Sequence, residues 1–154
     1  ISLLSSAAGP SGMVGGQYLD IKSDSIQVDS KYLDQMHFLK TSELIRASVC
    51  IGGMLGGANV EQQKALSDFG TYIGLAFQIV DDILDFEGDE ELLGKPIGSD
   101  LASGKVTYLS LYGIERSREI ANSTLEKAID FLKIFGKDAR TLVALAKFIV
   151  FRSL

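Results

Sequence analysis

The chain has 154 residues, of which 46% are hydrophobic and 23% charged, and its formal net charge at pH 7 is −5. This composition predicts one globular domain with a real core and excludes a disordered chain. The acidic balance argues against a nucleic-acid surface, and it makes phosphate binding unexpected unless cations intervene.

The number of cysteines and the length of the apolar runs further limit which class of protein this can be. Cys50 is the only cysteine and lies in an apolar run, so we expect a buried core residue and a reducing compartment. No uninterrupted stretch of about 18 apolar residues occurs, so no transmembrane anchor is predicted. The first residues lack a basic region and a cleavage pattern; they suggest a chain that begins partway through an element rather than a signal peptide.

The spacing of apolar residues predicts an all-α protein. A short helix is expected over 12–22, a long helix over 31–56 after an N-cap at Asp29 or Ser30, and another over 60–87 after an N-cap at Asn59. Residues 88–104 contain four glycines and a proline, which predicts a loop. A further long helix is expected from Lys105 to about Phe135, ended by Gly136, and a last amphipathic helix over 138–152.

A polar stripe runs along the helix predicted over 60–87. Its members are Thr71, Gly74, Gln78, Asp81 or Asp82, and Asp85. Asp81 and Asp85 are i,i+4 neighbours at the negative end of the helix dipole, and each effect costs about 0.3 to 1 kcal/mol at exposed sites. The nearest cationic residues in sequence are Lys64 and Lys95, so a divalent cation such as magnesium would relieve the repulsion. A solvated acidic helix end is the alternative.

A second polar stripe lies on the helix predicted over 31–56, and it comprises His37, Lys40, Thr41, Ser48 and Gly52. A lysine beside a hydroxyl suits an anion, although a solvated lysine is the simpler interpretation. His37 has no partner at ligand spacing, so we expect it at the helix surface or core edge and predict no zinc site.

Lysines of the predicted loop add positive charge directly after the acidic helix end. Lys95 and Lys105 each follow a glycine, and Asp100 lies between them. Backbone and ammonium groups of such segments could approach a diphosphate closely.

Taken in order, four segments resemble the C-terminal half of a trans-type isoprenyl (polyprenyl) diphosphate synthase. They are GMVGGQYLDI, MHFLKTSELIRASVCIGGMLGGA, GLAFQIVDDILDFEGDEELLGKPIGSDLASGKVTYLSLYG and LVALAKFIVFRSL. Within the family, the chain is most similar to the bacterial farnesyl or geranylgeranyl diphosphate synthase branch. The resemblance implies a bundle of long antiparallel helices around a deep apolar cavity, of which residues 1–154 form the C-terminal part of a single domain. It also implies a homodimer, in the cytoplasm or in a plastid.

The resemblance implies a magnesium-dependent prenyltransferase that condenses an allylic diphosphate with isopentenyl diphosphate into a longer trans-polyprenyl diphosphate. It makes Asp81, Asp82 and Asp85 the metal ligands, with Asp81 the firmest and Asp100 in the outer shell. Catalytic and substrate-binding roles, on the allylic diphosphate or the developing cation, fall to Lys40, Thr41, Gln78, Lys95 and Lys105. Gln17 and Asp20 match a G-Q-x-x-D motif, with Gln17 and Phe77 near the prenyl chain.

The family's first aspartate-rich motif, its paired arginines and its upstream basic site are expected before residue 1. We therefore expect this chain to be a fragment that is inactive alone, with its product length open. Two other interpretations remain: a non-catalytic helical partner subunit of a heteromeric synthase, or part of a terpene cyclase. The acids and lysines present together, and the G-Q-x-x-D and Lys-Thr patterns, favour the synthase.

Overall fold

The computed structural model describes residues 1–23, 26–87 and 105–152. Regular structure in these ranges is helical throughout, without a strand, which confirms the predicted all-α class. The elements are α1 (Ser2–Ala8), α2 (Met13–Ser23), α3 (Ser30–His37), the π-helix η1 (Phe38–Ser42), α4 (Glu43–Leu55), α5 (Val60–Glu87), α8 (Tyr108–Tyr112), α9 (Ile114–Phe131), the 3-10 helix η2 (Leu132–Ala139) and α10 (Arg140–Phe151). None of the described helices is both long enough and apolar enough to cross a bilayer.

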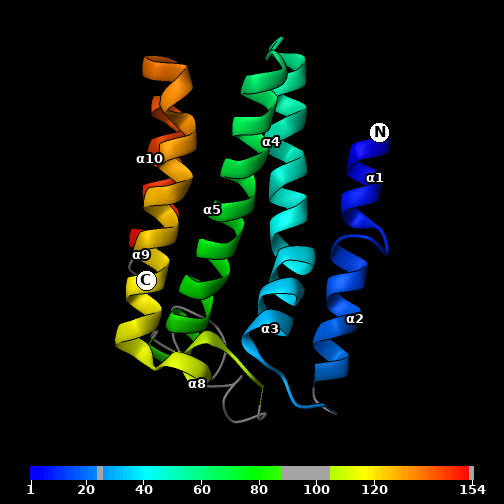
Figure 1. The fold of residues 1–154 in the computed structure, drawn as a ribbon, viewed down its shortest axis with the longest axis vertical. Helices are drawn as coiled ribbons and strands as arrows, with labels where there is room; N and C mark the ends of the chain where they lie inside the picture. Colours follow the sequence, from blue (N-terminus) through cyan, green and yellow to red (C-terminus); the bar gives the residue numbers. More distant parts are fainter. Residues whose placement is uncertain (24–25, 88–104, 153–154) are drawn as a thin grey trace.

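The long helices lie side by side in an antiparallel bundle (Figure 1). The 28-residue α5 is the central rod, with α4 along one side and α9 along the other. Outside them, α1 and α2 cover α4 and the π-helix, while α10 packs on α9. The acidic C-terminal end of α5 therefore lies at the same end of the bundle as α2, α3 and α8.

Predicted caps start two of the helices. The Tyr32 amide donates to Asp29 Oδ1 at 2.8 Å at the start of α3. At the start of α5, the Gln62 amide donates to Asn59 Oδ1 and the Asn59 amide donates to Gln62 Oε1, both at 2.9 Å. These bonds satisfy amides that have no partner inside the helix, which confirms the predicted N-caps.

Glycines bring α2 and α5 unusually close to the segment that carries Lys40. A Cβ on Gly74 would lie 2.5 Å from Ser42 Cα, and one on Gly70 would lie 2.6 Å from Arg46 Cα. A Cβ on Gly16 would lie 2.1 Å from the Lys40 amide nitrogen. A side chain at any of the three would push the helices apart, so these glycines set the spacing around Lys40.

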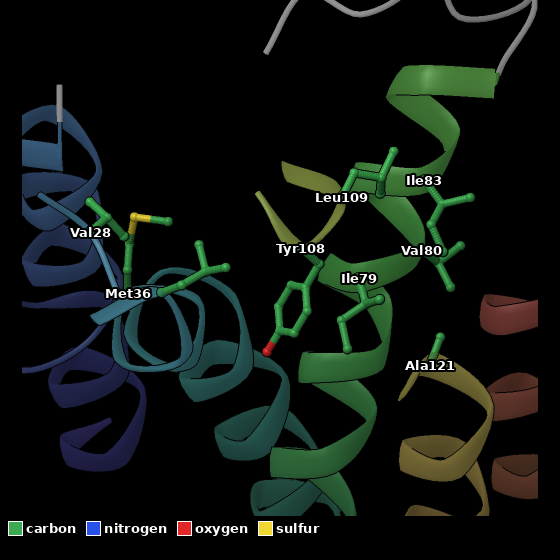
Figure 2. Close-up of a cluster of buried hydrophobic side chains, with 9 residues drawn as sticks. Val28, Met36, Ile79, Val80, Ile83, Tyr108, Leu109 and Ala121 are labelled. Carbon is green, nitrogen blue, oxygen red and sulfur yellow. The ribbon is translucent and has the colours of Figure 1, made fainter. Parts of the chain in front are cut away.

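Two apolar cores fill the bundle. The core at the acidic end of α5, shown in Figure 2, consists of Val28, Leu33, Met36, Ile79, Val80, Ile83, Tyr108, Leu109 and Ala121. The second core, between α5, α9 and α10, consists of Leu66, Phe69, Ile73, Ala76, Leu125, Ala128, Leu132, Ala139 and Ala146. Cys50, at 5% exposure, is a buried core residue as predicted.

The prediction of one helix from Lys105 to Phe135 is wrong at its start. Residues 105–107 are not helical, and α8 ends before Gly113, whose φ of 74° lies in the left-handed region that an α-helix excludes. A capping box between Thr107 and Ser110 starts α8, with the Thr107 amide donating to Ser110 Oγ at 2.9 Å. The predicted interruption at Gly136 is confirmed, because its φ of 54° breaks the helical run there.

Candidate functional site

The predicted rod over 31–56 contains a π-helical turn at the position of Lys40 and Thr41. Over Phe38–Ser42 the backbone widens, and the Glu43 amide donates to the Phe38 carbonyl, five residues earlier. Such π turns are rare and occur frequently at functional sites. Because the turn holds one extra residue, the face seen before it is offset from the face seen after it.

This offset corrects the predicted alignment of the second polar stripe. Lys40 and Thr41 are half-buried against α2 and α5, whereas Ser48 and Gly52 line a separate groove with Phe135. His37 is 4% exposed, so of the two positions expected for it, helix surface or core edge, the helix surface is excluded. Burial, followed by the charge of Lys40, lowers the pKa of His37 from its ordinary 6.5 to about 4, so the ring is neutral at pH 7.

Two lysine ammonium groups and one amide meet at the buried carboxylate of Asp20. Lys40 Nζ donates to Asp20 Oδ2 at 2.7 Å, and Lys105 Nζ lies 3.9 Å from the same oxygen. Gln17 Nε2 donates to it at 3.5 Å. Lys40 and Lys105 are 65 positions apart in sequence, yet the fold directs both to one carboxylate, which creates a compact cationic site beside α2.

A chain of hydrogen bonds connects the π-helix to the acidic end of α5. Thr41 Oγ1 donates to Gln78 Oε1 at 3.0 Å, and Gln78 Nε2 donates to Asp82 Oδ1 at 3.1 Å. The Tyr108 amide donates to the other carboxylate oxygen of Asp82 at 3.1 Å. The orientation of the Gln78 amide is thereby fixed, with its oxygen facing Thr41 and its nitrogen facing Asp82.

The three acids of the predicted metal motif have different surroundings. Asp82 and Asp85 are 6% and 4% exposed, whereas the side chain of Asp81 is 52% exposed. Arg152, 71 positions away in sequence, places Nη2 3.4 Å from Asp81 Oδ1 and its guanidinium 4.6 Å from the centre of the Phe77 ring. The acidic helix end therefore does face a cation, Arg152. Because Arg152 is distant in sequence, the nearest cations along the chain, Lys64 and Lys95, gave no indication of it.

The three acids do not form a ready-made three-ligand metal site within the described ranges. The described ranges contain no group of three or more metal-ligating side chains close enough to share an ion. Magnesium usually takes one or two protein carboxylates and completes its shell with phosphate oxygens and water. Asp81 is the acid of the motif with the most exposed side chain, and Asp85, its i+4 neighbour on α5, is buried.

Tyr108 and Asp34 are site residues that sequence reasoning did not identify. The Tyr108 ring lies between α3 and α5, with Met36 on one side and Ile79 on the other (Figure 2). Its hydroxyl donates to Asp34, and its ring stacks on His37 with centroids 5.8 Å apart. Burial, and next this hydrogen bond to Asp34, raises the pKa of Tyr108 well above its ordinary value. No spacing rule links positions 34 and 108, so the sequence held no signal for this contact.

The predicted site residues are therefore brought together in part. Gln17, Lys40 and Lys105 meet at Asp20, while Thr41 and Gln78 join Asp82 on the neighbouring helices. Phe77 lies beneath Arg152. Lys95 and Asp100 lie outside the described residues.

Comparison with known proteins gives one consistent family. The family model for polyprenyl synthetase matches residues 2–146. The farnesyl diphosphate synthase of Micrococcus luteus is 42% identical over 153 residues, which cover 99% of this chain and 53% of the relative. The chloroplastic geranylgeranyl pyrophosphate synthase of Catharanthus roseus is 42% identical over 151 residues, covering 97% and 42%. The chain thus spans about half the length of the curated relatives it matches.

Solved structures of other proteins share the fold of this chain. An FPP/GFPP synthase from Zymomonas mobilis superposes with a TM-score of 0.83 at 36% identity, over 97% of this chain and 49% of that one. A geranyltransferase from Helicobacter pylori, complexed with magnesium and isoprenyl diphosphate, gives a TM-score of 0.81 at 31% identity, over 97% and 49%. The arrangement of α1 to α10 is therefore that of half of such a synthase, which confirms the predicted fold.

Proposed function

Because this chain belongs to the polyprenyl synthetase family, we propose that it forms part of a magnesium-dependent prenyltransferase that condenses an allylic diphosphate with isopentenyl diphosphate. The product is a longer trans-polyprenyl diphosphate of the farnesyl or geranylgeranyl type, as in the named relatives. The observation that carries this proposal is the convergence of Lys40 and Lys105 beside the Thr41–Gln78 pair. We also propose that residues 1–154 are the C-terminal part of one synthase domain.

The cationic site at Asp20 supports diphosphate binding. In the described geometry Asp20 gathers two ammonium groups that would otherwise repel each other. A diphosphate offers several oxygens of higher charge, to which Lys40 and Lys105 would donate while Asp20 keeps their stems in place. Gln17 on α2, whose amide reaches Asp20, would contact the ligand from the same side. Lys95 lies outside the described residues, and its contact with the diphosphate is still a prediction.

Thr41 and Gln78 are suited to stabilise positive charge on the allylic carbon as diphosphate departs. The Thr41 hydroxyl hydrogen points to Gln78 Oε1, so its oxygen lone pairs are directed away from that bond. The face of the Phe77 ring already accepts a cation, the guanidinium of Arg152, at 4.6 Å. Oxygen lone pairs and an aromatic face can both stabilise a nearby carbocation electrostatically.

Asp81 and Asp85 are the residues that we propose to hold magnesium. Bound there, the ion would neutralise charge on the leaving diphosphate. Asp82, the third predicted ligand, has donors from the protein on both carboxylate oxygens, so we propose no metal contact for it in this geometry.

Subunit assembly and location remain predictions. We propose a homodimer, supported by the apolar side chains that α2 exposes, which are Met13, Val14, Tyr18 and Ile21. One relative from Arabidopsis thaliana is named a heterodimeric synthase large subunit, so light scattering on the purified chain, alone and with candidate subunits, tests this point. We propose a cytoplasmic location, or a plastid one for a plant or algal source; the chloroplastic relative from Catharanthus roseus supports the plastid alternative.

Magnesium-dependent binding of inorganic pyrophosphate tests the proposed function. Titration calorimetry of the 154-residue chain should show pyrophosphate binding that requires magnesium, and Asp81→Ala or Lys40→Ala should weaken it at least tenfold. Glu119→Gln, at an exposed ion pair on α9, is the matched control and should bind normally. Binding that is indifferent to magnesium, or to Asp81→Ala, would contradict the proposal. A prenyl-transfer assay on the same material tests the separate expectation that the chain alone does not turn over.

A further inference from the structure

Asp82 is one of two buried acids of its motif, since Asp85 is also buried and Asp81 alone of the three has an exposed side chain. Asp82 is 6% exposed, and two donors, Gln78 Nε2 and the Tyr108 amide, each reach one of its oxygens at 3.1 Å. A carboxylate has about four acceptor positions, and these bonds hold the group between Gln78 on α5 and the start of α8. Both of these donors are uncharged groups that fix the direction of the carboxylate.

Tyr108 connects Asp82 to the rest of the bundle. Its amide binds Asp82 on α5, its hydroxyl donates to Asp34 on α3, and its ring is 3% exposed. His37 stacks on that ring at an interplanar angle of 19°. The tyrosine is thus fixed at both ends, and its amide can hold Asp82 in one orientation.

His37 contributes shape rather than a hydrogen bond to this cluster. Its Nε2 lies 3.9 Å from Asp82 Oδ2, beyond hydrogen-bond distance, and neither ring nitrogen has a partner among the described residues. The hydrogen bonds from Tyr108 and Gln78 therefore help to orient Asp82 without one from His37.

We propose that Asp82 is a positioning residue for Gln78 and Thr41, and that Tyr108 fixes it in that role. The contacts form one series, in which Tyr108 holds Asp82, Asp82 orients the Gln78 amide, and the Gln78 oxygen accepts from Thr41. Lys105, whose Nζ lies 3.9 Å from Asp20 Oδ2, stands three residues before this tyrosine in the chain. That these groups serve prenyl transfer rests on the proposed function; the positioning itself rests on the contacts.

Comparing Asp82→Asn with Asp81→Asn tests the proposal. Gln78 and Tyr108 donate to different carboxylate oxygens of Asp82, and asparagine replaces one of these oxygens by an NH2 group that donates, so in the same side-chain position it loses one of the two bonds. Asp82→Asn should keep the magnesium dependence of pyrophosphate binding, with less than a twofold change in magnesium affinity. Amide hydrogen exchange over residues 38–42 and 105–110 should rise at least threefold. Asp81→Asn should show the reverse: magnesium affinity falls at least tenfold and exchange in both segments stays unchanged.

Tyr108→Phe provides a second variant if Asp82→Asn does not fold. It removes only the hydroxyl that donates to Asp34, and Tyr112→Phe, on the neighbouring exposed tyrosine of α8, is its matched control. Exchange over 105–110 should rise at least threefold in Tyr108→Phe and stay unchanged in Tyr112→Phe.

Two outcomes overturn the positioning role. One is an equal loss of magnesium affinity in Asp82→Asn and Asp81→Asn; the other is equal exchange in Tyr108→Phe and Tyr112→Phe. Failure of the proposed function has a different sign: the wild-type chain would not bind pyrophosphate in the presence of magnesium. In that case the hydrogen-exchange comparison still tests the positioning role of Asp82 and Tyr108.

Discussion

The ammonium of Lys40 donates a 2.7 Å hydrogen bond to the buried carboxylate of Asp20, across the contact between the π-helix and α2. The carboxylate is 10% exposed and the lysine side chain 33% exposed, so solvent screens the pair only in part. The bond is therefore a structural contact of α2 as well as a feature of the candidate site.

Asp20→Asn should lower the free energy of unfolding by about 1 to 2 kcal/mol, because it removes a charge-assisted bond that is half shielded from water. Urea unfolding of the purified chain measures the change. Glu119→Gln breaks the Arg116–Glu119 pair, whose side chains are 64% and 65% exposed, and should change stability by less than about 0.5 kcal/mol. Equal stability of the two variants would show that the Asp20 contact contributes nothing to the fold.

Arg152→Gln should raise the affinity for magnesium about two- to fivefold. The guanidinium of Arg152 faces Asp81, the proposed ligand, and an exposed pair of this kind is worth about 0.2 to 1 kcal/mol, which metal binding must overcome. Arg118→Gln is the control, since it removes the same charge from a neighbouring helix, where Arg118 pairs with Glu87 instead. Calorimetric titration with magnesium and pyrophosphate measures both; a lower affinity in Arg152→Gln than in Arg118→Gln would mean that Arg152 assists the ligands.

His37 should make the fold less stable as pH falls from 6.5 toward 4. Burial lowers its pKa to about 4 in the folded chain, so within this window the unfolded chain binds a proton that the folded chain does not. The free energy of unfolding then decreases with falling pH, by up to about 3 kcal/mol at the lower end, and is unaffected above the unfolded pKa.

Denaturant unfolding at several pH values, compared with His37→Phe, isolates this contribution. Phenylalanine keeps a ring against Tyr108 but does not titrate, so the variant should lose the extra slope while keeping any slope due to carboxylates. Because His37 is the only histidine, its NMR titration gives the folded pKa directly. A pKa near 6.5 would contradict the expectation.

Gly74→Ala should lower the free energy of unfolding by about 1 to 3 kcal/mol, since the new Cβ would lie 2.5 Å from the Ser42 backbone. Gly52→Ala is a matched helical control with nothing within 4 Å of its Cβ, and it should stabilise the chain by up to about 1 kcal/mol. Thermal or urea unfolding of the two variants checks the opposite signs. Similar behaviour at both positions would mean that close approach at Gly74 is not required.

The sequence predicted helix starts well where they depend on a capping residue close by in the chain. Asn59 and Asp29 cap their helices as expected, because capping depends on residues three positions apart. The long helix predicted from Lys105 failed because Gly113 adopts a positive φ, which its sequence neighbours permit but do not require. The helical spacing of apolar residues continues on both sides of Gly113, so the sequence pattern did not indicate the break.

The sequence predicted which residues belong to the candidate site better than it predicted the contacts between them. Resemblance to a family selected Lys40, Thr41, Gln78 and the acids, and the fold places Lys40 and Lys105 together. Arg152 and Tyr108 could not be found in this way, since they reach the site from 71 and 26 positions away from their acidic partners. Such pairs depend on how helices pack, which one sequence does not encode in any local pattern.

The π turn at Phe38–Ser42 makes the site dependent on backbone geometry as well as on residue identity. Straightening this turn into regular α-helix, with the number of residues unchanged, would rotate everything before it by about 100° relative to α4. Asp34 and His37 would then turn away from Tyr108 even though every site side chain was still present. Transferring this site to another helical scaffold therefore requires transferring the irregular turn together with the side chains.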